Sequence, residues 1–406
     1  MTAGLLVALA VQNSVPPFAT DMYAPSFPAL TADLKTTSAL VGLTLTTFFI
    51  GMGLGQMFGG AFSDQVGRRR PVIVGGLICT LGALGCVLAP TVGVLIVARL
   101  IQGFGGGMAS ASGRAVLVDL AVGRHLASAM SLMMALGGLA PMIAPVVGGM
   151  IATVATWRVV FWCLVGFGAI MTGVAVLVIP ESLPPLRRRT GGLVRTLGGL
   201  GTLLRRPPFV CFMFVSCFSS FAMFAYIADS SYVLQDITGL SPLMFALAFA
   251  LNALVQMGIA FLNARLVGRF DPRRLLRLGL TMAAVAVCLL AVSVFALGTP
   301  LWLTAGSFTL LMAGQGFIFG NSSAIALSHA RESAGIGSAL MGLLQSLASS
   351  LSAPLASSGG GRTAVPMVIV MLIGSAAAWS FFTLARRAEA ATRADEAATA
   401  DAESAG

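Results

Sequence analysis

Long apolar runs separated by short polar segments make up almost the whole chain. We delimit twelve such runs, at residues 2–24, 39–62, 72–90, 92–117, 128–152, 158–180, 208–234, 242–263, 275–297, 301–327, 336–357 and 364–385. Each is long enough to cross a hydrocarbon core of about 30 Å as a helix, which needs roughly 20 residues. Because the runs are continuously apolar and do not alternate residue by residue, the pattern predicts an all-α membrane protein with twelve transmembrane helices. It disfavours an outer-membrane barrel.

The composition excludes a soluble protein. Of the 406 residues, 57% are hydrophobic and only 9% are charged, whereas soluble domains carry about 25% charged residues. The first twenty residues carry no charge. Because a signal peptide begins with basic residues, we expect this apolar start to be the first spanning helix instead.

The distribution of charge predicts an orientation in the membrane. The net charge is +10, but the basic residues form short clusters between the apolar runs, which is typical of membrane topology and not of a nucleic-acid-binding face. Counted by loop, 19 arginines fall on one side of the membrane, and only Lys35, Arg158 and Arg362 fall on the other. By the positive-inside rule, both termini are expected in the cytoplasm.

Internal similarity predicts two six-helix bundles related by pseudo-two-fold symmetry. The sequence QGF at 102–104 recurs at 315–317, and AP at 144–145 recurs at 353–354; coincidence in a low-complexity sequence is the alternative explanation. The expected parts are an N-terminal bundle at 1–182, a basic cytoplasmic linker at 183–207, a C-terminal bundle at 208–387 and a disordered acidic tail at 388–406. In such an architecture a central site is exposed alternately to each side of the membrane.

The loop after the second run reads GAFSDQVGRRRP at 60–71. This loop resembles the signature loop of the major facilitator superfamily at Gly60, Asp64, Gly67, Arg68 and Arg69. Gly60 is expected to let helices approach closely, and Gly67 to permit a tight turn. The carboxyl of Asp64 can pair with the arginines near the helix end. A further acid on the same side, Asp119, can join this cluster, which is expected to hold one conformation and to break in another. A purely topological arginine cluster is the alternative.

The fourth and fifth runs carry two further motifs. The stretch RLIQGFGGG at 99–107 resembles the family's R-x-x-Q-G motif, which the resemblance ties to proton transfer. Arg99 would be costly inside a membrane without a partner or water. A structural ion pair is the alternative explanation for this arginine. The stretch LAPMIAPVVGG at 139–149 resembles the family's antiporter signature at Pro145, Gly148 and Gly149. Ordinary packing of small residues is the alternative for this second stretch.

Four more segments resemble the Bcr/CflA drug-resistance transporters. They are DMYAPSFPAL at 21–30, WRVVFW at 157–162, PESLPP at 180–185 and FIFGNSSAIAL at 317–327. The resemblance runs over nearly the whole chain. It implies a drug:proton antiporter of a bacterial inner (plasma) membrane, expected as a monomer in the lipid bilayer, with protons and a small-molecule drug as its ligands. It implies no cofactor, because the proton gradient supplies the energy.

Two acidic residues lie in apolar runs, where an uncharged side chain is the usual choice. Asp21 can hold a proton in apolar surroundings and release it when a cation approaches, so Asp21 and Arg99 are the proton-coupling candidates; an interfacial helix cap is the alternative for Asp21. Asp229 departs from the resemblance. It has three open interpretations: a site for a cationic substrate, a second protonation site, or a residue in a wet outer mouth.

A set of polar and aromatic residues could line a substrate cavity. They are Tyr23, Arg114, Phe221, Tyr226, Asp229, Gln256, Gln315 and Asn321. Packing against neighbouring helices is the alternative for each of them. A stripe of Gly51, Gly55 and Gly59 predicts a helix-packing face.

Several functions have no supporting motif. The single lysine makes no P-loop, the six cysteines form no CxxC pair, and no GxSxG elbow is present, which argues against an ATP-driven motor, a zinc site and a hydrolase. The leading hypothesis is a proton-coupled exporter of small amphipathic antibiotics, similar to bicyclomycin or chloramphenicol resistance proteins. A uniporter or symporter of a metabolite is the alternative with the same fold, and a membrane-embedded enzyme or receptor is the alternative from another class.

Overall fold

The structure is a computed structural model, and it describes residues 3–120, 140–185, 188, 201, 203–330, 334–360 and 362–404. These residues form an almost entirely helical protein. The first half contains α1 (Ala3–Asn13), α2 (Val15–Asp21), η1 (Ala24–Ser26), α3 (Phe27–Asp33), α4 (Ser38–Val66), α5 (Arg69–Val87), α6 (Val92–Leu120), an apolar helix at Ala140–Val154 and α8 (Trp157–Val178). The second half contains α10 (Pro207–Tyr232), η3 (Val233–Ile237), α11 (Pro242–Leu266), α12 (Pro272–Ala296), α13 (Leu301–Ser328), α14 (Ala334–Ala356), η5 (Ser357–Gly359) and α15 (Val365–Ser404).

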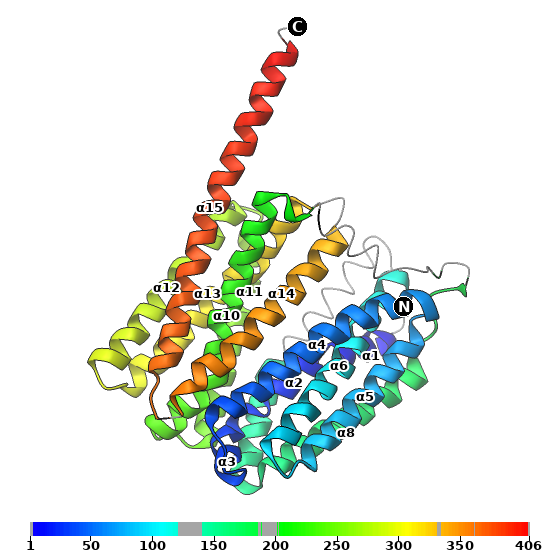
Figure 1. The fold of residues 1–406 in the computed structure, drawn as a ribbon, viewed down its shortest axis with the longest axis vertical. Coiled ribbons are helices and arrows are strands. Elements are labelled where there is room, and N and C mark those ends of the chain that lie inside the picture. The colour runs from blue at the N-terminus through cyan, green and yellow to red at the C-terminus, as the bar shows by residue number, and fades with distance from the viewer. Residues whose placement is uncertain are drawn as a thin grey trace.

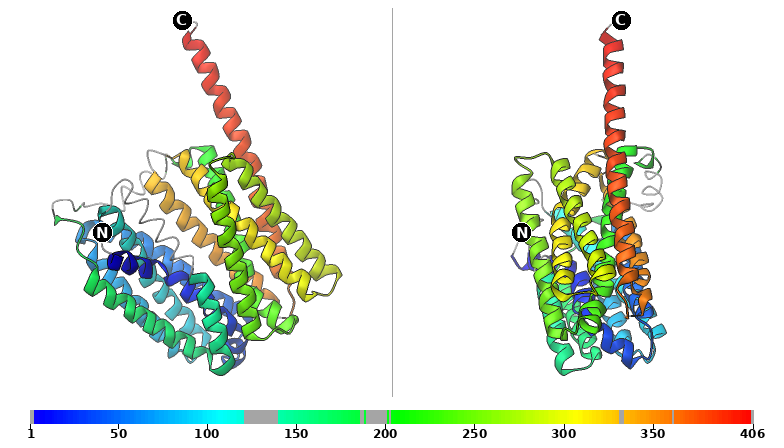
Figure 2. Two further views of the ribbon diagram at one scale, coloured as in Figure 1. Left: turned by 180° about the vertical axis from the view of Figure 1, so that it is seen from behind. Right: turned by 90° about the vertical axis from the view of Figure 1, so that its left-hand side faces the viewer.

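The helices form two bundles that lie side by side (Figure 1). The N-terminal half, in blue and cyan, meets the C-terminal half, in green to red, where α4 packs against α14. The view from behind shows the same two groups (Figure 2). All-α architecture is therefore confirmed, and the boundary between the halves lies along two long helices.

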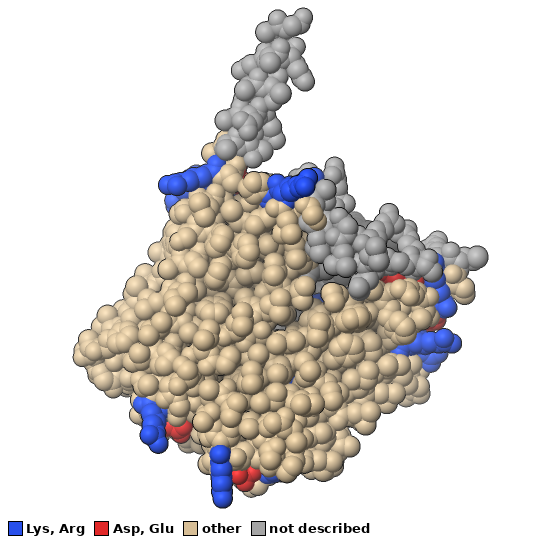
Figure 3. Space-filling model, in the orientation of Figure 1, with Lys and Arg blue, Asp and Glu red and all other residues tan. Residues whose placement is uncertain are grey.

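Within the described residues, nine helices are long and apolar enough to cross a membrane, and two shorter apolar helices lie at Gly4–Asn13 and Ala140–Val154. Charged side chains gather at two ends of the visible face, and a wide band between them carries almost none (Figure 3). One end, where α4 meets α5 and α11 meets α12, is here called the arginine-rich end and includes Arg68 and Arg273. The other, where α3 meets α4 and α8 begins, is called the opposite end and includes Lys35 and Arg158. Such a band fits a bilayer, whose core excludes charged groups.

The first apolar run is not the single helix that the sequence predicted. It breaks at Ser14, so that α1 ends at Asn13 and α2 begins at Val15. Pro16 and Pro17 follow directly and have no backbone N–H to donate to the preceding turn, while the Ser14 hydroxyl donates to the Ala10 carbonyl at 2.9 Å. The proline pair therefore redirects the chain without removing it from the bundle.

The tail also differs from the expectation. Residues 388–404 were expected to be disordered, but α15 continues through them to Ser404 and projects beyond the bundle (Figure 1). This segment is rich in alanine, which has the highest intrinsic helix propensity. A helix that is already formed by the membrane-spanning part extends at low cost, because its nucleation is complete.

Glycines let α4 and α6 touch backbone to backbone. A Cβ atom at Gly55 would collide with the Phe104 carbonyl, and one at Gly103 would collide with the Phe48 carbonyl. The stripe of glycines along α4 is therefore a packing face, as predicted. Gly60 differs from the expectation, because a Cβ atom there would meet nothing within 4 Å. Its place in the signature loop does not serve close helix approach.

This contact generates a stability prediction. Gly55→Ala should lower the melting temperature of the detergent-solubilised protein, since overpacking of this kind costs about 1–3 kcal/mol. Gly60→Ala is the matched control in the same helix and should leave the melting temperature unchanged or slightly higher, because alanine is the better helix former. Thermal unfolding followed by intrinsic fluorescence measures both variants. Equal shifts in the two would contradict the role given to Gly55.

Candidate functional site

Arg99 is a fully buried cation in the N-terminal half. It lies on α6, is 0% exposed, and its Nη1 donates to Gln102 Oε1 at 2.8 Å. Residues three apart share one helix face, so the R-x-x-Q spacing itself brings the two side chains together. The guanidinium carbon lies 4.4 Å from the ring centre of Phe48 and 5.2 Å from that of Tyr23. The aromatic rings therefore stabilise part of the buried charge.

The Arg99 guanidinium still has unused donors. Its Nε and Nη2 have no hydrogen-bond partner among the described residues. A buried polar group without a partner is costly in apolar surroundings. Arg99 is thus positioned by aromatic contacts but not neutralised by them, and it can attract an anionic group or water that enters the bundle.

Asp21 ends α2 and lies at the boundary between the halves. Its side chain is buried, and Oδ1 accepts a hydrogen bond from the Thr20 hydroxyl at 2.8 Å. The carboxyl also lies near enough to the Tyr226 hydroxyl of the C-terminal half to interact with it electrostatically. Among the described ion pairs there is none between Asp21 and Arg99, so the two coupling candidates are not in direct contact in this conformation.

Tyr23 connects these two candidates indirectly. It is 0% exposed, its ring faces the Arg99 guanidinium, and its hydroxyl lies 3.3 Å from the Thr44 hydroxyl of α4. Residues two apart do not share a helix face. The end of the first apolar run therefore presents Asp21 and Tyr23 in different directions, and Tyr23 lies against Arg99.

A polar chain continues from Tyr226 into the C-terminal bundle. The Asn252 Nδ2 of α11 donates to the Tyr226 hydroxyl at 2.9 Å, and Asn252 Oδ1 accepts from the Thr309 hydroxyl at 2.7 Å. Tyr226 also stacks on Phe249 with ring centres 5.5 Å apart. These contacts fix the position of the Tyr226 hydroxyl.

The other proposed cavity residues occupy different surroundings. Gln315 is buried and donates to the Ser219 carbonyl at 3.2 Å, and Asn321 is buried and donates to Asn263 Oδ1 at 2.7 Å. Both therefore join helices within the C-terminal half, as the packing alternative predicted. Phe221 and Gln256 are half-buried, whereas Arg114 is exposed. Only the orientation of the helices, which sequence does not give, separates these cases.

The signature loop forms a charge cluster at the arginine-rich end. Arg68 pairs with Asp64 and, through Nε, with Asp119 Oδ2 at 2.9 Å. Its backbone N–H donates to Glu181 Oε1 at 2.8 Å. Gly67 has φ +101°, where a side chain would be strained. Arg68 thus ties together the ends of three helical segments of the N-terminal half.

Arg69 does not join the acids of this cluster. Its Nη2 donates to the Val176 carbonyl at 2.7 Å, which holds the start of α5 against the end of α8. Glu181 was missed as a member of the cluster. Its position just after α8, in a run of prolines and serine, gave no periodic signal.

The C-terminal half has a similar cluster that the sequence analysis did not find. Glu389 Oε2 accepts from Arg273 Nε at 2.9 Å, and Glu389 Oε1 lies 2.9 Å from His329 Nε2. Glu389 follows Glu181 by 208 residues, and His329 follows Asp119 by 210. The repeat interval could have revealed this cluster, because intervals of this size relate the two halves elsewhere.

Contacts between the halves gather at the opposite end. The Thr31 hydroxyl lies 2.8 Å from the Tyr232 hydroxyl, and the Ser38 hydroxyl donates to the Ser357 carbonyl at 2.8 Å. The Phe49 and Phe224 rings meet edge to face at 4.6 Å. These pairs link α3 and α4 of the first half with α10 and η5 of the second.

The antiporter-like motif contributes to the same interface. Pro145 is buried. A Cβ atom at Gly148 would collide with the Met22 carbonyl, directly after Asp21, and one at Gly149 would collide with Ala246 of α11 in the other half. The two adjacent glycines therefore let one helix touch both the segment that carries Asp21 and the C-terminal bundle.

A salt bridge secures the N-terminal half at the opposite end. The Asp33 carboxylate accepts from Trp157 Nε1 at 2.9 Å and from Arg158 Nη1 at 2.7 Å. These hydrogen bonds, that from Trp157 first, hold the pKa of Asp33 below its usual value. The Arg158 guanidinium lies 4.2 Å from the Trp157 ring centre. The clamp joins the end of α3 to the start of α8.

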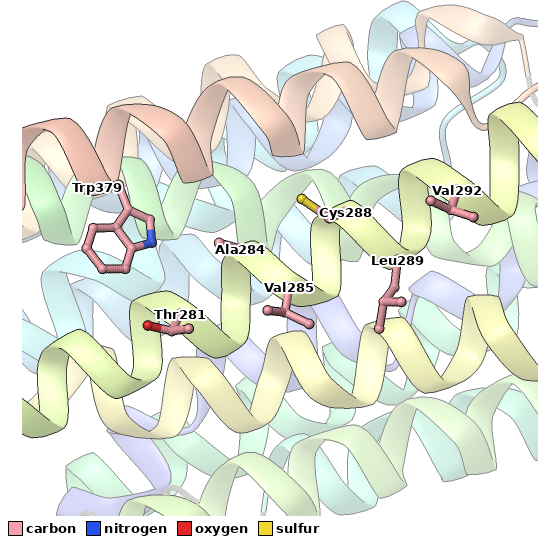
Figure 4. Close-up of a pocket in the computed structure, with 7 residues that line it drawn as sticks. All are labelled: Thr281, Ala284, Val285, Cys288, Leu289, Val292 and Trp379. Carbon is pink, nitrogen blue, oxygen red and sulfur yellow. The ribbon is translucent and has the colours of Figure 1, made fainter.

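An apolar groove lies between α12 and α15 (Figure 4). Its lining includes Val285, Cys288, Leu289 and Trp379. The lining contains no acidic or basic side chain, and it involves the C-terminal half alone. This groove is therefore separate from the residues that join the two halves.

Comparison with known proteins agrees with this architecture. The sequence model described as the Major Facilitator Superfamily matches residues 11–353. The uncharacterized MFS-type transporter YdgK of Bacillus subtilis is 32% identical over 88% of this chain and 89% of its own. A bicyclomycin resistance protein homolog of Haemophilus influenzae is 28% identical over 93% of this chain and 96% of its own. The multidrug resistance protein MdtL of Salmonella heidelberg is 29% identical over 88% of this chain and 89% of its own.

Solved structures show the same fold at low sequence identity. The xylose transporter XylE of E. coli, in a partially occluded inward open conformation, has a TM-score of 0.72 at 16% identity and covers 94% of this chain and 97% of its own. The nucleoside transporter NupG has a TM-score of 0.74 at 10% identity, and the match covers 95% of this chain and 99% of its own. Because the family match spans most of the chain and the helices adopt this fold, the protein is a multi-pass membrane transporter, not an enzyme, and it belongs to the Major Facilitator Superfamily.

Proposed function

We propose that this transporter exports small amphipathic antibiotics from the cytoplasm in exchange for protons. Relatives that are called bicyclomycin resistance and multidrug resistance proteins support drug efflux. The charge distribution supports an orientation in the inner membrane of a bacterium with both termini in the cytoplasm. The arginine-rich end then faces the cytoplasm, and the closed opposite end faces the outside.

The observation that carries this proposal is the position of Asp21. Its carboxyl is buried at the boundary between the halves, and among the described residues no cationic side chain pairs with it. An ionised carboxylate in such a place is costly, whereas a protonated one is tolerated. A group of this kind couples proton binding to any movement that changes its access to water.

The transport cycle follows from alternating access. When the outer end opens, the Asp21 carboxylate takes a proton from external water. When the cytoplasmic end opens, Asp21 releases the proton to cytoplasmic water and the drug binds between the halves. One proton moving inward across about 100 mV and one pH unit releases about 3.7 kcal/mol, which supports a roughly 500-fold gradient of a neutral drug. No cofactor is needed, and one chain suffices.

Arg99 acts on this step from within the N-terminal half. Its unpaired donors attract the Asp21 carboxylate once the proton has left, and Tyr23 lies against the Arg99 guanidinium at the end of the same segment as Asp21. Deprotonation would therefore pull on the end of the first apolar run. That movement would reach the interface, because Met22 packs against Gly148.

The role of Asp21 is testable in cells and vesicles. Asp21→Asn should abolish proton-driven efflux of chloramphenicol or bicyclomycin, because an amide cannot exchange a proton, while membrane insertion stays normal. Drug accumulation in a pump-deficient host, with and without a protonophore, measures the wild type and the variant. Asp21→Glu is the matched variant that keeps the titratable group and should retain part of the activity. Full efflux by Asp21→Asn would remove this residue from the mechanism.

The interface at Gly149 generates a second prediction. Gly149→Ala should shift the equilibrium toward the state that is open to the outside, by roughly 5- to 150-fold, because overpacking costs about 1–3 kcal/mol. The readout is alkylation of Ser38→Cys by a membrane-impermeant maleimide, in a background that lacks the six native cysteines. Gly173→Ala is the control, since a Cβ atom there meets nothing within 4 Å. Alkylation that is equally slow in both variants would show that Gly149 does not seal the interface.

A further inference from the structure

Asp229 is a second buried acid, and the mechanism above does not use it. It lies near the end of α10 and is only 2% exposed. Its Oδ1 has no hydrogen-bond partner among the described residues. In this conformation the side chain is therefore not in a wet outer mouth, which was one of the three interpretations that the sequence left open.

One residue separates Asp229 from the boundary between the halves. The carboxyl lies beside Ser357 of η5, whose hydroxyl also lacks a well-formed hydrogen bond. The Ser357 backbone carbonyl accepts the hydrogen bond from Ser38 of α4, and a Cβ atom at Gly42 of α4 would lie 3.3 Å from the Ser357 hydroxyl. Movement of α4 away from η5 would therefore uncover Ser357 and open a path for water to Asp229.

No cation of the described residues forms an ion pair with Asp229. Tyr232, one turn away and bonded to Thr31 across the boundary, is a titratable group that interacts with it electrostatically. On the same segment Asp236 is exposed. Of the helices that pack against α10, α13 and α14 contain no charged residue, and α4 contains only Asp64, at its other end. The charged residues of α15 begin at Arg386, at the arginine-rich end, and α3 contributes only the acid Asp33. Among the described residues, Lys35 and Arg362 at the opposite end form no ion pair with Asp229.

The repeat gives Asp229 a counterpart. It follows Asp21 by 208 residues, which is the interval between Glu181 and Glu389 in the two charge clusters. Each acid therefore lies at the same place in its half, toward the outer end of the first long helical segment. The surroundings differ, because Asp21 interacts electrostatically with Tyr226 of the other half, whereas Asp229 lies beside Ser357 of its own half.

We propose that Asp229 is a second proton-binding site, located behind the outer interface, and that it must bind a proton from the external side before that end closes. Opening separates Ser38 from Ser357 and hydrates the carboxyl, which loses its proton to external water. Closure requires the reverse step, in which external hydronium protonates the carboxylate before it is buried. The proton enters and leaves on the same side. It therefore regulates the outer interface and adds nothing to the number of protons moved per drug.

The proposal rests on the outward orientation of this interface in the proposed function, but its test does not depend on transport. Spin labels on Leu40→Cys and Ser358→Cys, both exposed and on different halves, report the width of the outer end in lipid nanodiscs. Pulsed electron spin resonance between pH 5 and pH 9 measures the fraction of molecules in which the two labels are at the shorter, closed-state distance. The labels are introduced in a background without native cysteines.

The wild type should lose the short distance as the pH rises, with the ratio of closed to open molecules falling by up to roughly tenfold per pH unit, as expected for one linked proton. Asp229→Asn should stay closed over the whole range, because the amide cannot ionise. Asp236→Asn removes an exposed charge from the same segment and should behave as the wild type. Asp229→Glu should keep a pH dependence with a displaced midpoint.

Two results would overturn the proposal. One is a wild-type distance distribution that does not change with pH. The other is the same pH dependence in the wild type and in Asp229→Asn. If Asp229→Asn does not fold, a pH midpoint in Asp229→Glu that equals the wild-type midpoint counts equally against the proposal. A shift that requires ethidium at constant pH and disappears in Asp229→Asn would instead assign the carboxyl to cationic substrates. Absence of proton-driven efflux with these distance changes intact would contradict the proposed function alone.

Discussion

The direct backbone contact between α4 and α6 is the interaction on which both functional regions depend. Glycines on both helices remove the side chains that would separate them, and this places the Phe48 ring 4.4 Å from the Arg99 guanidinium. Another face of α4 carries Ser38 and Gly42, which contact the end of α14 and η5 in the other half. One helix therefore both supports the buried cation and forms the boundary between the bundles. A displacement of α4 at that boundary changes the surroundings of Arg99, without the need for a separate connecting element.

Arg99, Asp21 and Asp229 are all buried, but the protein compensates their side chains in different ways. An arginine cannot readily lose its proton, so Arg99 has to be stabilised where it lies, and three aromatic rings and Gln102 do so in part. A carboxyl can become neutral by binding a proton, and it then needs far less compensation. Asp21 accordingly has one short hydrogen bond, from Thr20, and Asp229 has none that is well formed. The weaker the compensation, the more the burial of an acid depends on its proton.

Sequence reasoning succeeded where local spacing determines the contact. Asp64 and Arg68 are four residues apart on one helix end, and the glycines of α4 recur every four residues, so both arrangements follow from helical geometry. It failed where orientation between helices decides. Helix α13 is apolar all round, and such a helix gives no sign of which face Gln315 presents. The absence of an ion pair between Asp21 and Arg99 among the described residues likewise depends on the turn at the end of α2. The break at Ser14 was foreseeable from Pro16 and Pro17, but the length of the run concealed it.

The repeat carries more information than single motifs, because equivalent positions that differ show where the halves have separate tasks. The counterpart of Arg99 in the second half is Met312, and within the part of the chain that the structure describes the buried arginine belongs to the N-terminal bundle. The acid at the end of the first segment is present in both halves, as Asp21 and Asp229. An acid whose half also contains a cation has an attractive group inside the bundle for its ionised form, and it can ionise while the outer end is closed. An acid without such a group can ionise only in water. The same residue type at equivalent places is therefore suited to carrying a proton across the membrane in one half, and to sensing whether the interface is open in the other.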